Sequence, residues 1–112
     1  MVTHTLECSE PYFSQVRRGE KTVEGRKGTT RWDKIKEGDI VIFDDEKGHT
    51  FRTKAIKINR YPDIRSYLES ETLERALPGV KTIEEGIAVY LQWSTEDEVF
   101  LHGFLGITIE VL

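Results

Sequence analysis

A short charged stretch holds the side chains of this sequence that are best suited to chemistry. Lys21, Glu24 and Arg26 lie within six residues, separated by threonine, valine and glycine. A lysine can act as a base or as a point charge, and an arginine donates a planar fork to a phosphate or a base edge. A carboxylate can accept from an exocyclic amine such as that of cytosine. The stretch therefore predicts a polar ligand site, with Lys21 and Glu24 as candidate catalytic residues and Arg26 as a binding residue.

The alternative interpretation is a surface strand with ordinary salt bridges, each contributing about 0–1 kcal/mol to stability. Alternation along a flat strand would point Lys21 away from Glu24 and Arg26. The three side chains meet only if the segment bulges or turns, which Gly25 would allow. A shared cleft would favour the functional interpretation, and splayed side chains would favour the salt bridges.

Three further residues are candidates for substrate binding. Thr22 lies inside the charged stretch. Trp32 lies in a basic run, where an aromatic ring can stack on a nucleobase, although a loop-anchoring role fits equally well. Tyr61 either lines the same cleft or ends a strand against the core. Tyr90 and Trp93 fall on an apolar helical face and are expected in the core.

Composition limits the classes of function. The chain has 112 residues and a formal net charge of −4, which predicts one domain over residues 1–112. Residues 15–36 hold eight basic and three acidic side chains, and the remainder is acidic. This imbalance predicts one basic face, which is compatible with a phosphate-bearing ligand but too weak for duplex DNA. We expect a monomer.

Several other features are expected to be absent. No apolar run reaches the roughly 20 residues that span a bilayer, and no signal peptide is evident, so no membrane partner is expected. A single cysteine, Cys8, excludes an internal disulfide and favours a cytoplasmic location. The three histidines lack metal-ligand spacing, and no phosphate loop or dinucleotide motif occurs, so neither metal nor cofactor is expected.

The elements that must position the charged stretch can be predicted from periodicity. A short helix ending at Gly19 leads into an extended segment over residues 20–27. Further strands are expected at 3–7, 40–43, 50–61 and 104–111, and helices at 63–77 and 82–93, with an acidic loop at 94–99. The apolar stripe of 63–77 slips near Ser70, which predicts a kink or two short helices there. The apolar phase switches within 50–61, from odd positions to Ile56 and Ile58, which predicts a bulge or bend. Five to six strands and about three helices form an α+β domain whose sheet curls into a small mixed β-barrel.

The sequence also resembles a known family, the ASCH domain (activating signal cointegrator homology). The resemblance covers nearly the whole chain and rests on four segments: G-E-K-T-V-E-G-R at 19–26, E-G-D-I-V-I-F at 37–43, Tyr61, and the run from Leu73 to Leu77-Pro78-Gly79-Val80. It implies a fold similar to the RNA-binding PUA domain. It also implies a cleft lined by the K-T-x-E-x-R segment that binds RNA or a modified nucleoside.

The resemblance leaves an enzymatic alternative open. Some bacterial relatives are amidohydrolases of N4-acetylcytidine that use a lysine, a threonine and a glutamate. Their lysine would fall on Lys21, but their threonine would fall on Glu24, so this sequence departs from the pattern. Glu71 and Glu74 lie near the expected place of the glutamate, but no motif selects either one. The departure at Glu24 favours binding over hydrolysis, with a small amidohydrolase acting on N4-acylated cytidine as the alternative.

Overall fold

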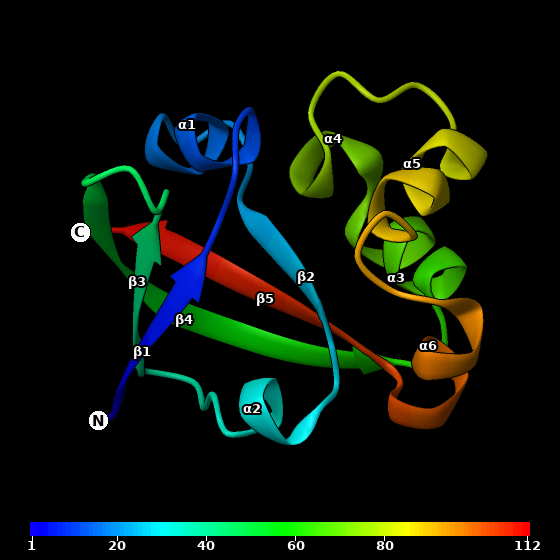
Figure 1. The fold of residues 1–112 in the computed structure, drawn as a ribbon, viewed down its shortest axis with the longest axis horizontal. Coiled ribbons are helices and arrows are strands. Elements are labelled where there is room, and N and C mark those ends of the chain that lie inside the picture. The colour runs from blue at the N-terminus through cyan, green and yellow to red at the C-terminus, as the bar shows by residue number, and fades with distance from the viewer.

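One curled five-stranded sheet organises the fold, which is seen in a computed structural model that describes residues 1–112 (Figure 1). The strands are β1 (Thr3–Glu7), β2 (Val23–Lys27), β3 (Ile40–Asp44), β4 (Thr50–Tyr61) and β5 (Phe104–Val111). Their order is β1-β3-β4-β5-β2, with β1 and β3 parallel and the other neighbours antiparallel. The sheet forms an open half-barrel, so the predicted α+β class with a small barrel-like sheet is confirmed.

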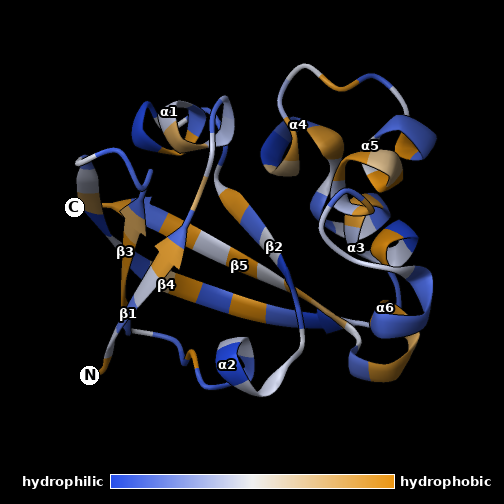
Figure 2. Cartoon of the chain, viewed as in Figure 1, coloured by the Kyte–Doolittle hydropathy of each residue, from blue (hydrophilic) through white to orange (hydrophobic).

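The long strand β4 produces much of the curl. Its first half pairs with β3 and its second half with β5, and the register shifts between Ala55 and Lys57. This shift is the bulge that the change of apolar phase predicted. Ile56 itself is 43% exposed, because it is the extra residue at the bulge and is not part of the inward-facing row. Figure 2 shows apolar and polar residues alternating along β4 and β5.

Six helices accompany the sheet, where about three were expected. They are α1 (Tyr12–Arg17), α2 (Thr30–Asp33), α3 (Ile64–Glu71), α4 (Leu73–Ala76), α5 (Ile83–Tyr90) and α6 (Glu96–His102). The segment 63–77 forms two short helices, α3 and α4, as one of the two expected alternatives, and the break lies at Thr72, whose φ is 74°. The expectation of an acidic loop over 94–99 is wrong, because Thr95 and Glu98 form a complete capping box that starts α6.

Two apolar clusters lie on the two sides of β2. The first packs the sheet against α1 and α2, with Phe13, Val41 and Phe43 among its most buried members. The second packs the other end of the sheet against α3 to α6, around Tyr67 and Phe104. In Figure 1 β2 runs between the main sheet and the helices of the second cluster. No helix is both long and apolar enough to span a bilayer.

Candidate functional site

Lys21 is a buried ammonium placed just before β2. The chain leaves α1 through Gly19, whose φ of +78° needs the left-handed region that glycine favours. The Lys21 Nζ then donates to the backbone carbonyl of Val23 at 2.8 Å and to that of Ala76 at the end of α4. It also lies 3.5 Å from Glu24 Oε1. Lys21 is therefore a cation with three acceptors arranged around it.

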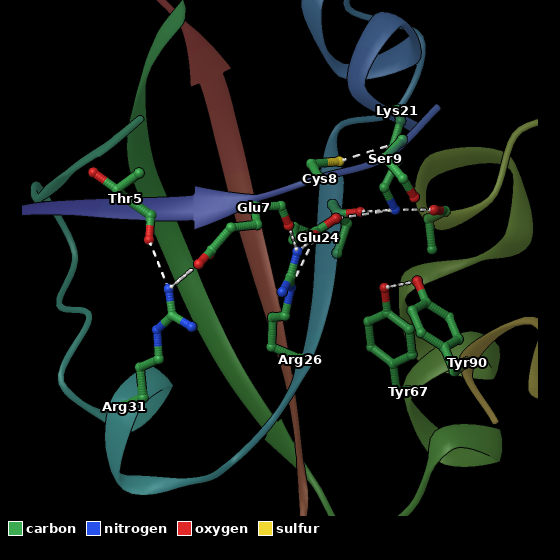
Figure 3. Close-up of polar contacts among 12 residues, drawn as sticks. Thr5, Glu7, Cys8, Ser9, Lys21, Glu24, Arg26, Arg31, Tyr67 and Tyr90 are labelled. Atoms are coloured by element: carbon green, nitrogen blue, oxygen red, sulfur yellow. Dashed lines mark hydrogen bonds and ion pairs between the residues drawn. The ribbon is translucent and has the colours of Figure 1, made fainter. Parts of the chain in front are cut away.

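Glu24 and Arg26 occupy one face of β2 and form a close ion pair. The Arg26 Nε and Nη2 lie 2.9 and 2.8 Å from Glu24 Oε2. Arg26 Nη2 also donates to the backbone carbonyl of Glu7 at 2.7 Å. The guanidinium lies 4.9 Å from the ring centroid of Trp32. Figure 3 shows Glu24 between the lysine and the arginine, so one carboxylate joins both cations.

These three side chains therefore converge, but not by the route expected from the sequence. The strand begins only at Val23, so Lys21 precedes it and the alternation of side chains along the strand does not apply to Lys21. Gly25 is not at a bulge, since it pairs in register with Gly106. A Cβ on Gly25 would lie 2.6 Å from the Tyr67 hydroxyl, so this glycine allows β2 to approach the aromatic core closely.

A cleft of about 390 Å³ opens over the Lys21–Glu24–Arg26 triad. This volume falls within the range typical of small-molecule sites. Tyr12 from α1 and Tyr90 from α5 line it, as does Trp93, which follows α5. Trp93 is 53% exposed and meets Tyr12 edge-on, with ring centroids 5.9 Å apart. The expectation that Trp93 belongs to the core is wrong, whereas Tyr90 is buried as expected.

Of the other three sequence candidates, one lines the cleft and two do not. Trp32 lines the cleft but is only 8% exposed, because the guanidinium groups of Arg26 and Arg31 pack on it. Thr22 lies outside the cleft, where its backbone N–H donates to the backbone carbonyl of Arg75. Tyr61 also lies outside the cleft. The structure thus brings Trp32, but neither Thr22 nor Tyr61, to the triad.

Neither downstream glutamate lines the cleft. The Glu71 side chain is buried, and its Oε2 accepts from Asn59 at 3.0 Å and from the Tyr61 hydroxyl at 2.5 Å. Glu74 is exposed on α4. Glu71, the last residue of α3, thus forms a separate polar cluster with Asn59 and Tyr61.

Burial sets the protonation preferences around the triad. Desolvation lowers the pKa of the Lys21 ammonium, and the nearby Glu24 carboxylate partly offsets this. Burial raises the pKa of the Cys8 thiol to about 12, with a further contribution from Glu24. Cys8 lines the cleft and is a protonated thiol at neutral pH. Burial likewise raises the pKa of Tyr90, which shares a hydrogen bond of 2.8 Å with Tyr67.

Sequence reasoning missed two wall residues, Tyr12 and Trp93. Trp93 was assigned to an apolar helical face and Tyr12 was not singled out, because periodicity alone does not distinguish a core face from the wall of a cleft. The one available signal was position: Trp93 follows the last regular turn of its helix and precedes the polar run from Ser94 to Glu98.

One family model and two solved structures match this chain. The model of the ASCH domain matches residues 6–110. The crystal structure of hypothetical protein PH0355 superposes with a TM-score of 0.92 at 35% identity, covering 99% of this chain and 100% of that one. The solution structure of protein PF0455 from Pyrococcus furiosus gives a TM-score of 0.80 at 34% identity, covering 100% and 98%. No curated protein matches the sequence significantly.

Proposed function

This chain belongs to the ASCH domain family, and from that membership we propose that its cleft binds one nucleobase, presented by RNA or by a modified nucleoside. The observation that carries the proposal is the triad at the base of a cleft with aromatic walls. Specific RNA-binding proteins take up unstacked bases in this way, by stacking the ring and bonding its edge.

Glu24 and Arg26 offer complementary groups to the edge of a base. Glu24 Oε1 has only the 3.5 Å contact with Lys21 and so retains capacity to accept a hydrogen bond. Arg26 uses Nε and Nη2 within the protein, which leaves its Nη1 free to donate. An acceptor beside a donor matches an exocyclic amine next to a ring nitrogen or carbonyl. Lys21 then serves to hold Glu24 in place.

Trp93 and Tyr12 are the residues best placed to stack on the ring of the base. Trp93 is half exposed, and Tyr12 supports it edge-on. Stacking on an aromatic side chain contributes about 1–3 kcal/mol per base. Trp32 was the sequence candidate for this role, but its buried ring instead orients Arg26.

The test is the substitution Arg26→Lys, titrated by calorimetry with N4-acetylcytidine and with a short single-stranded RNA. Lysine keeps the charge but cannot donate as a planar fork, so binding should weaken about tenfold. The matched control is Arg65→Lys, because Arg65 forms an exposed ion pair with Glu84 far from the triad. Equal affinities for Arg26→Lys and the unsubstituted protein would contradict the proposal.

The alternative function is an amidohydrolase acting on N4-acylated cytidine. It is favoured by one observation, the buried Lys21 amine with its lowered pKa, which could act as a base. Against it, the Nζ donors are directed to two carbonyls and a carboxylate, and Cys8 is held as a thiol. Prolonged incubation with N4-acetylcytidine should therefore leave the compound intact, and release of cytidine and acetate would establish the hydrolase instead.

A further inference from the structure

We propose that the cleft selects uncharged ligands, so that its ligand is a nucleoside without a phosphate. This inference rests on the proposed function and narrows its ligand class. It starts from the charges that line the cleft, which are three cationic and four acidic side chains: Lys21, Arg26, Lys27, Glu7, Glu24, Asp45 and Glu46. A site for phosphate would show a surplus of positive charge with unused donors.

The two cations nearest the base of the cleft already have partners within the protein. The three donors of Lys21 face two backbone carbonyls and Glu24, and its side chain is 2% exposed. Arg26 is bonded to the same Glu24 carboxylate and to the Glu7 carbonyl, with one face on Trp32. A phosphate entering here would meet the Glu24 carboxylate at close range, and it would lose its hydration for a single free donor, the Arg26 Nη1.

The third cation is also paired. Lys27 Nζ lies 3.0 Å from Glu98 Oε2, which joins the end of β2 to the first turn of α6. Since Lys27 is at the rim and partly exposed, this pair is weaker than the two below it. It nevertheless places a second carboxylate beside the only lysine that an entering phosphate could reach.

The part of the rim formed by the β3–β4 turn is acidic. Glu46 lies in the β3–β4 turn, is exposed and forms no ion pair. Its neighbour Asp45 accepts from the backbone N–H groups of Lys47 and His49 and from the His49 ring. Glu46 therefore adds an uncompensated negative charge at the mouth, which repels anions approaching the cleft.

The basic segment found in the sequence does not supply the missing positive charge. Arg17 and Arg18 are exposed on and after α1 and do not line the cleft, and Arg18 pairs with Glu20. Lys34 and Lys36 are exposed after α2 and also lie outside it. Arg31 does not line the cleft either, and its charge is paired with the Glu7 carboxylate at 2.7 Å. The expectation that this segment provides a basic face for a phosphate-bearing ligand does not hold at the cleft.

The experiment compares matched pairs of ligands on the full chain. Cytidine, adenosine, guanosine, uridine and N4-acetylcytidine would each be titrated against their 5′-monophosphates, with a single-stranded RNA as a third arm. The best nucleoside should bind about three- to tenfold more tightly than its monophosphate. Its affinity should hardly change with salt, whereas single-stranded nucleic acid loses affinity with a slope of about −0.7 per phosphate contact.

The outcomes separate this inference from the proposed function. Tighter binding of the monophosphate or of RNA, with a steep salt dependence, would overturn the inference and leave nucleobase binding standing. Absence of binding by nucleosides, monophosphates and RNA alike would overturn both. Tighter binding of the nucleoside supports both.

A charge variant tests whether the acidic rim causes the preference for uncharged ligands. Glu46→Gln removes the unpaired carboxylate at the mouth, so the ratio of nucleoside to monophosphate affinity should fall about twofold or more. The control Glu69→Gln removes an equally exposed carboxylate of α3 that does not line the cleft, and the ratio should stay the same. An unchanged ratio in Glu46→Gln would overturn the assigned role of the rim.

Discussion

Glu24 is the residue on which the triad depends. Its carboxylate lies 2.8 Å from Arg26 and 3.5 Å from Lys21, with both its own side chain and that of Lys21 almost fully buried. A buried ammonium without a counter-charge is costly, and the two backbone carbonyls around Lys21 supply only partial charges. Glu24 therefore stabilises the fold, in addition to the recognition role proposed for it.

Replacing that carboxylate by an amide should be strongly destabilising. Glu24→Gln keeps the shape but leaves the Lys21 charge buried and unpaired, so the free energy of unfolding should fall by roughly 3–5 kcal/mol. Urea denaturation measures the change. The control Glu20→Gln breaks the fully exposed pair with Arg18 and should leave the midpoint in place. Equal midpoints for both variants would mean that Lys21 is neutral in the folded protein.

At the scale of elements, the start of β1 is tied to the start of β3 by one carboxylate. Asp39 precedes β3, and its oxygens accept from the Val2 and Lys36 N–H groups, each at 3.0 Å. The His4 ring adds a contact of 2.8 Å. These hydrogen bonds lower the pKa of Asp39 from 3.8 to about 2, with His4 contributing most. The parallel pair β1–β3 thus has an ionised residue at its origin.

Acid should loosen this pair. Because the folded pKa lies below the unfolded one, the stabilisation is present above about pH 4 and is lost as pH falls towards 2. The loss corresponds to roughly 2 kcal/mol. Asp39→Asn should lower stability at pH 7 and flatten this part of the pH profile, as followed by urea midpoints between pH 2 and 5. A variant profile parallel to that of the unsubstituted protein would refute the assignment.

The features that could be predicted from the sequence are those that depend on residues close together in the chain. The bulge in β4 and the starts of the helices at Asp63 and Thr82 depend on a few neighbouring residues, so local pattern revealed them. The convergence of the triad depends on where β2 begins, which its pairing with β5 decides. Trp93 was expected in the core but is exposed, and Trp32, for which stacking and loop anchoring were both open, is buried. Exposure depends on packing against residues distant in the sequence, which periodicity does not contain.

At the scale of the molecule, the two walls of the cleft come from distant parts of the chain. Tyr12 comes from α1 and packs against both apolar clusters, whereas Trp93 follows α5, and the two rings meet edge-on. A base held between these walls would contact both α1 and the segment after α5. Trp93 is the more exposed of the two tryptophans, so it should report the occupancy of the cleft.

Tryptophan fluorescence can test this arrangement. Bound nucleoside should protect the exposed tryptophan from quenching by acrylamide, since Trp32 is already buried. Trp93→Phe should abolish the ligand-dependent change, while calorimetry still detects binding that is weaker by up to about tenfold. A full fluorescence response in Trp93→Phe would place the ligand beside Trp32 instead.

The position of β5 in the sheet also bears on how the protein is made. β5 is the last strand in the sequence, yet it pairs with both β2 and β4 and holds the triad-bearing strand in the sheet. A growing chain that has not reached Phe104 therefore contains Lys21, Glu24 and Arg26 but no framework to bring them together. Assembly of the triad must wait until synthesis has passed β5, and a truncation before this strand would separate the three side chains even though every residue of the triad remained.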